Sequence, residues 1–155
     1  MRPATTEAKA VLAAIIKKFN RKEMQMSTSA AIIIRQPDGT VRAVRLNWDG
    51  YVAHTGAILG GWYKTAEEVN ALIALGDLSE INETLESCVA YHRDSGELYR
   101  LPRTFASVEN YQYCGMWQMN ANYLYIFDDG VWHVYGIDRT SEWIGLEVTK
   151  NMEEQ

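Results

Sequence analysis

The sequence predicts an α+β domain in which an antiparallel sheet, built from hairpins, packs against two or three helices. Three observations predict it. Strand-like segments pair around Pro37-Asp38-Gly39 and again around Asp128-Asp129-Gly130, and both turns have the chemistry of hairpin turns. A helix with a capping box lies between the two hairpins. An amphipathic helical stretch precedes them.

The composition is that of one folded domain. Of the 155 residues, 47% are apolar and 23% charged, which excludes the disordered, collagen-like and disulfide-scaffold classes. We expect a helix and linker over 1–25, a single α+β domain over 26–150 and a tail over 151–155. A net charge of -5 disfavours phosphate backbones, so no sequence-specific nucleic-acid partner is predicted. Short apolar runs and the lack of a signal-peptide core predict no membrane partner and a cytoplasmic location.

An amphipathic helix is predicted over residues 5–20. Its apolar stripe comprises Val11, Leu12, Ile15, Ile16 and Phe19. Basic residues from Lys17 to Lys22 close its polar side, where cations suit the negative end of the helix dipole. We expect the stripe to dock on the domain or on a second copy of the chain, which makes a homodimer through this helix one option.

The first hairpin and a glycine-rich helix follow. A β-branched run at Ile32, Ile33 and Ile34 pairs with a strand from Val41 to Trp48. Residues 51–63 are predicted to be helical even though they contain three glycines, each of which weakens a helix by about 1 kcal/mol relative to alanine.

A second helix begins at the capping box Thr65-Ala66-Glu67-Glu68 and ends at Gly76. Val69, Leu72 and Ile73 form its apolar face. Residues 77–87 are expected to be a loop or a short helix opened by Ser79.

The last third of the chain predicts two more hairpins. Residues 88–91 and 98–101 pair around Asp94-Ser95-Gly96, and residues 123–127 pair with 131–135. Both faces of the final hairpin are apolar or aromatic, so it is expected to be central in a sheet or covered on both sides. Residues 107–119 show no clean period, and residues 143–148 are expected to add an edge strand.

No catalytic or metal site emerges from the spacing. Cys88 and His92 are four positions apart, about 13 Å along a strand, so they share a face without touching. No nucleophile elbow, phosphate loop or dinucleotide fingerprint is present. Three histidines and two cysteines match no ligand pattern for a metal. We therefore predict no enzyme activity, no metal and no cofactor.

Two constellations of functional residues remain. The first is Trp48-Asp49-Gly50-Tyr51 with His54, where a strand end meets a helix start, a common ligand position. Its alternative is structural, with the two rings in the core and Asp49 as a helix cap. The second is His92-Arg93-Asp94 at a hairpin tip, where Arg93 is either solvated or pairs with Asp49 or an anionic ligand.

Several motifs resemble a family of small uncharacterised bacteriophage and prophage proteins. They are Trp48-Asp49-Gly50-Tyr51 with His54, Leu75-Gly76-Asp77-Leu78-Ser79, Tyr91-His92-Arg93-Asp94 and residues 125–132, within a span of 32–135. Members often carry Cys-His before the first motif and proline after it. This chain has Leu46, Asn47 and Val52 there, which argues against catalysis or metal binding through those groups. The resemblance implies a phage context and no reaction.

The leading hypothesis is a phage accessory protein, in the cytoplasm of the infected host, that binds and inhibits a host protein such as a CRISPR or restriction component. Trp, Tyr and Arg dominate interface energetics. The candidate interface or ligand residues are Trp48, Asp49, Tyr51, His54, Trp62, Tyr63, His92, Arg93, Asp94 and Trp132. One alternative is a nucleotide-signal sponge, with phosphate held by Arg93 or by the helix that begins at Ala66. The last alternative is an enzyme that uses Asp49, His54 and His92.

Overall fold

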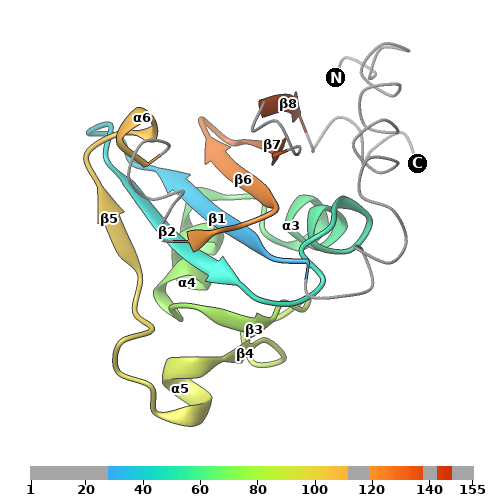
Figure 1. Cartoon of the computed structure of the whole chain (residues 1–155), viewed down its shortest axis with the longest axis vertical. Coiled ribbons are helices and arrows are strands. Elements are labelled where there is room, and N and C mark those ends of the chain that lie inside the picture. The colour runs from blue at the N-terminus through green and yellow to red at the C-terminus, as the bar shows by residue number, and fades with distance from the viewer. Residues whose placement is uncertain (1–27, 112–118, 138–142, 148–155) are drawn as a thin grey trace.

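The protein forms one mixed sheet with short helices against it (Figure 1). The computed structural model describes residues 28–111, 119–137 and 143–147. The strands described are β1 (Ala30–Arg35), β2 (Val41–Leu46), β3 (Leu78–Glu80), β4 (Val89–Ala90), β5 (Arg103–Phe105), β6 (Tyr123–Asp128), β7 (Val131–Ile137) and β8 (Trp143–Glu147). The helical elements are the short π-helix η1 (Val52–Gly56), α3 (Ala57–Trp62), α4 (Ala66–Ala74), α5 (Tyr91–Ser95) and α6 (Val108–Asn110).

The predicted α+β class is confirmed, but the sheet is mixed and not purely antiparallel. Its order is β4-β3-β2-β1-β6-β7-β8, with β5 pairing β2 off this path. β1 runs parallel to β6, and β2 runs parallel to β3. Each hairpin is antiparallel within itself, so the parallel contacts arise only where separate parts of the chain meet.

β1 lies at the centre of the sheet and separates two cores. Ala30, Ile32 and Ile34 face the larger core, while Ala31 and Ile33 face a smaller one. β6 has the same alternation: Tyr125 and Phe127 enter the first core, and Leu124 and Ile126 the second. The prediction that the final hairpin is covered on both faces is confirmed for β6.

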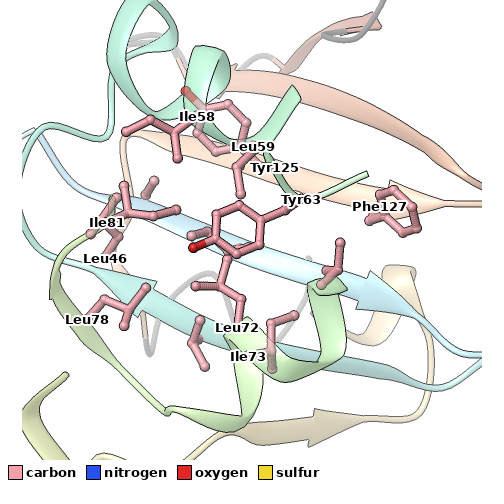
Figure 2. Close-up of a cluster of buried hydrophobic side chains, with 14 of the residues drawn as sticks. Leu46, Ile58, Leu59, Tyr63, Leu72, Ile73, Leu78, Ile81, Tyr125 and Phe127 are labelled. Atoms are coloured by element: carbon pink, nitrogen blue, oxygen red, sulfur yellow. The ribbon is translucent and has the colours of Figure 1, made fainter. Parts of the chain in front are cut away.

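α4 covers the larger core in the way that its sequence predicts (Figure 2). The Thr65 hydroxyl accepts a hydrogen bond from the Glu68 backbone, and the Glu68 carboxylate accepts one from the Thr65 backbone, which completes the capping box. The predicted face of Val69, Leu72 and Ile73 is fully buried.

The first and last hairpins are confirmed. Gly39 takes a φ of 88° in the first turn, which glycine adopts without a steric penalty. Asp129 and Gly130 take φ values of 50° and 79° in the last, as a type I′ hairpin turn requires. β8 pairs with β7 at the edge of the sheet, as predicted.

The predicted hairpin of residues 88–91 and 98–101 is wrong. β4 has only two residues and pairs with β3, and the chain then turns into the short helix α5. The Asp94 carboxylate accepts a hydrogen bond from the Ala90 backbone, 2.8 Å away, and Gly96 ends the helix with a φ of 70°. The residues that suggest a hairpin tip therefore begin and end a helix.

The predicted helix over residues 51–63 is confirmed, first as η1 and then as α3. Other regions depart from the prediction or lie outside the described residues. The expected loop or short helix over 77–87 contains β3, and the ambiguous stretch 107–119 begins with α6. The predicted helix over 5–20, the linker to residue 25 and the tail at 151–155 lie outside the described residues.

Candidate functional site

The Trp48-Asp49-Gly50-Tyr51 motif builds the turn from β2 into η1. A Cβ on Gly50 would lie 2.8 Å from the Ser29 carbonyl carbon, so only glycine fits against β1. The Tyr125 hydroxyl donates to the Gly50 carbonyl (2.8 Å), and the Thr55 hydroxyl donates to the Asp49 carbonyl (2.7 Å). The backbone of this motif thus fixes the turn between β2 and η1.

Trp48 and Asp49 do not play the structural roles expected for them, whereas Tyr51 packs against the larger core. Trp48 is half-exposed and does not fill the core. Asp49 does not cap the helix: Tyr51 is the residue at the N-cap, and no side chain caps that position. Tyr51 and His54 are half-buried, with ring centroids 5.9 Å apart. Trp48 therefore does not contribute to the core, and Asp49 does not cap the helix.

The side chains of the second constellation, His92-Arg93-Asp94, interact with neighbouring residues of the protein. The Arg93 guanidinium donates to Asp94 and to the carbonyls of Leu85 and Cys88. This pairing with Arg93 is the main cause that lowers the pKa of Asp94. His92 Nδ1 lies 3.4 Å from the Glu97 carbonyl oxygen. Among the described residues, no interaction joins this group to Asp49 or His54, the set that the enzyme alternative requires.

The two groups expected to hold a phosphate in the nucleotide alternative are also engaged. The Arg93 guanidinium already donates to Asp94 and to backbone carbonyls. The Glu68 carboxylate lies over the N-terminus of α4. A carboxylate there repels an anion. Neither Arg93 nor the N-terminus of α4 therefore supports a nucleotide phosphate, as the nucleotide alternative requires.

Two of the predicted aromatic candidates lie inside the protein. Trp132 is buried, and its Nε1 donates to the Tyr63 carbonyl (2.8 Å). Tyr63 is buried as well, and its hydroxyl donates to the Asn82 carbonyl (2.8 Å). Burial raises the pKa of Tyr63. These two rings stabilise the core, whereas Trp48 and Trp62 are half-exposed.

A charged cluster centred on Asp77 is the most distinctive polar feature of the described residues. On its outer edge, β2 pairs with β5 over Val41–Ala43 and with β3 at Leu46. Between them the Arg45 backbone N–H donates to Asp77 Oδ1, 2.8 Å away. At the point where β3 and β5 diverge, the Asp77 carboxylate therefore accepts the backbone hydrogen bond that a neighbouring strand would otherwise accept.

Three arginines surround this one carboxylate. Arg103 donates two hydrogen bonds to Asp77, at 3.0 and 3.2 Å, and Arg100 Nε lies 3.4 Å from it. The Arg45 side chain donates to the Met119 carbonyl and to Asn47. Burial lowers the pKa of Arg45, and repulsion from Arg100 adds to the effect. The cluster carries more positive charge than Asp77 neutralises.

Tyr91 holds the cluster on its other side. The Arg100 guanidinium stacks over the Tyr91 ring, 4.1 Å from its centroid, and the Asn47 side chain donates to the Tyr91 hydroxyl. Such cation–π stacking favours a fixed guanidinium plane. In the sequence, Asp77 and Tyr91 stand out only as parts of motifs, because the three arginines converge from β2, β5 and a loop and share no spacing.

The loop Leu98–Leu101, termed the 98–101 loop, is fixed in its backbone and apolar on its outside. The Arg100 carbonyl accepts a hydrogen bond from the Asp77 backbone (2.9 Å), and the Arg100 N–H donates to the Glu97 carbonyl. Leu98 and Tyr99 nevertheless have relative exposures of 74% and 75%, and Leu101 is also exposed. A fixed backbone with exposed apolar side chains is typical of a preorganised binding surface.

A groove of about 540 Å³ separates the two hairpin turns near the start of α4. Arg35 and Asp128 line it and pair with each other at 3.4 Å. Ile34 and Phe127, both buried, also contribute to its lining. Its charged lining consists of the Arg35–Asp128 pair and Asp129, fewer converging charged groups than surround Asp77.

Within the described residues, no group of histidine, cysteine and acidic side chains is arranged to hold a metal ion. No helix in that part of the chain has the length and apolar character needed to cross a bilayer. Comparisons with protein-family models, curated proteins and solved structures found no match.

Proposed function

We propose that this chain is a phage-encoded, non-enzymatic accessory protein that binds and inhibits a protein of the bacterial host. The observation that supports binding is the 98–101 loop, where apolar side chains remain exposed on a fixed backbone. A host defence component, such as a CRISPR or restriction protein, is the proposed target. That finer part rests on the resemblance of the Trp48, Asp77 and Tyr91 motifs to phage proteins.

The loop has the properties of an interface centre. Aromatic and large apolar side chains provide most of the binding energy at interfaces, and a preorganised loop loses little entropy on binding. Arg100 lies in the middle of the loop, but its guanidinium is directed to Asp77 and to the Tyr91 ring, so the exposed part of the loop is apolar. We infer that the partner presents an apolar patch to the loop.

The proposal is tested by phage plating on bacteria that carry defined CRISPR or restriction systems. Expression of the chain should restore plaque formation on at least one such host. The double variant Leu98→Ser/Tyr99→Ala should lose this effect while keeping its melting temperature, because truncation of central aromatic anchors typically costs about 2 kcal/mol or more in binding.

The matched control is Thr104→Ala, an exposed position on β5, which should retain full activity. Trp62→Ala tests a second half-exposed ring away from the loop. Activity that survives the loop double variant but disappears with Asp49→Asn or His54→Ala would refute the proposal and favour a chemical site.

A further inference from the structure

We propose that the arginine cluster around Asp77 is a binding site for a terminal phosphate group. Asp77 is 1% exposed and pairs with Arg103 and Arg100, while Arg45 lies beside them. Three guanidinium groups against one carboxylate leave two positive charges without a counter-charge in the cluster. A phosphate monoester carries about −1.5 to −2 charges at neutral pH, whereas a carboxylate supplies one.

Arg100 has donors available for such a ligand. Its Nε and Nη2 atoms are buried without a hydrogen-bond partner among the described residues, and its Nε faces Asp77 only at 3.4 Å. A buried donor without an acceptor is costly. Arginine forms strong bidentate hydrogen bonds with phosphate oxygens, so a phosphate that enters the cluster would give these two buried donors the acceptor that they lack.

The site is both fixed and reachable. Arg103 is held by two hydrogen bonds to Asp77, and Arg100 is held over the Tyr91 ring. The side chains of Arg100 and Arg103 keep relative exposures of 22% and 31%, so a ligand approaches along their exposed parts and reaches Arg100 Nε and Nη2 by displacing the groups that cover them. Because the arginines are already positioned, binding requires little ordering of their side chains.

The phosphate has two sources with the same chemistry: a free phosphorylated metabolite such as a nucleotide, or a phosphorylated side chain of a bound protein. The site rests on Arg100, Arg103 and Asp77 and not on the apolar side chains of the 98–101 loop. It therefore stands or falls separately from the proposed inhibitor function.

The test is calorimetric titration of the full chain with inorganic phosphate, in chloride buffer at constant ionic strength. We expect saturable binding that Arg100→Gln weakens by about tenfold or more, since hydrogen bonds to charged groups contribute about 1.5–3 kcal/mol. Arg42→Gln is the matched control: Arg42 lies on β2, the strand that carries Arg45, but its guanidinium donates to Asn70 on α4. It should change the affinity by no more than about twofold, because Arg42 lies outside the cluster.

Absence of saturable phosphate binding to the unaltered chain would overturn the proposal, and so would an equal loss in Arg100→Gln and Arg42→Gln. If Arg100→Gln does not fold, Arg100→Lys keeps the charge but not the planar fork, and its affinity should also fall. Adenosine monophosphate and phosphotyrosine, each compared with its dephosphorylated form, distinguish the two sources. Cyclic adenosine monophosphate, a diester with a single charge, should bind more weakly than either.

Discussion

Gly50 joins the start of β1 to the turn into η1. Its N–H donates to the Thr28 carbonyl, and its carbonyl accepts from the Tyr125 hydroxyl. A Cβ at this position would lie 2.9 Å from the Ala30 Cβ, closer than real contacts allow. The turn therefore requires glycine at position 50 and does not depend on the charge of Asp49.

Gly50→Ala should destabilise the fold by about 1–3 kcal/mol, the usual cost of overpacking a rigid site. Gly61→Ala is the control, because its Cβ would meet nothing within 4 Å and it lies in α3. Alanine there should be neutral or stabilising by up to about 1 kcal/mol. Urea unfolding of both variants measures the difference, and equal stabilities would contradict the close contact.

The Asp94 carboxyl is expected to titrate below the ordinary aspartate range, because Arg93 donates to it and the Ala90 backbone donates a further hydrogen bond. A carboxyl whose pKa is lower in the folded state contributes stability above its unfolded pKa, near about 3.9. That contribution is lost as pH falls through the folded pKa. NMR titration of the carboxyl carbon measures it, and Arg93→Gln should move the pKa back upward.

At this scale the sequence leaves the partners of the site residues open. It offers Asp49 or an anionic ligand as the partner of Arg93, whereas Arg93 donates to its neighbour Asp94. The pairing of Asp77 with Arg103 spans 26 residues, and no periodicity relates the two positions. Exposure also escapes prediction, since Trp132 and Trp48 look alike in sequence but only Trp132 is buried.

Among the elements, α4 is the clearest case of a helix defined by its ends. Thr65→Ala should cost about 1 kcal/mol, because the capping box loses the hydroxyl that accepts the Glu68 N–H. Thr65→Ser keeps an oxygen at the same place and should stay close to the unaltered stability. Chemical denaturation of the two variants checks this, and an equal loss in both would assign the effect to the threonine methyl group.

Turn chemistry predicts hairpins well and their mutual arrangement poorly. Gly39 and Gly130 mark turns between neighbouring segments, so the β1–β2 and β6–β7 pairs are predicted. The parallel pairing of β1 with β6 joins residues that are more than 90 positions apart. β3 and β5 have three residues each, too short to show an alternation.

Across the whole molecule, charge gathers where strands diverge. A net charge of -5 suggests no anion site, yet the fold brings Arg45, Arg100 and Arg103 around Asp77. Net charge averages over the surface, whereas binding depends on local charge. This convergence is the part of the candidate site that only the fold reveals.

Buried tyrosines should make the fold sensitive to alkaline pH. Burial raises the pKa of Tyr63, Tyr111 and Tyr125 above the ordinary tyrosine value near 10. Their phenols ionise more readily in the unfolded chain, so stability is intact below about pH 10 and falls as pH rises above it. Each such tyrosine contributes a slope of up to about 1.4 kcal/mol per pH unit.

Urea unfolding followed by circular dichroism between about pH 9 and pH 12 measures this decline, with phenolate absorbance recorded on the native protein. Tyr125→Phe should start from lower stability, because the hydrogen bond to Gly50 is lost, but its stability should fall less steeply with pH. The buried rings should ionise only as the protein unfolds. Full ionisation of all nine tyrosines in a chain that keeps its native dichroism would contradict the burial of these three rings.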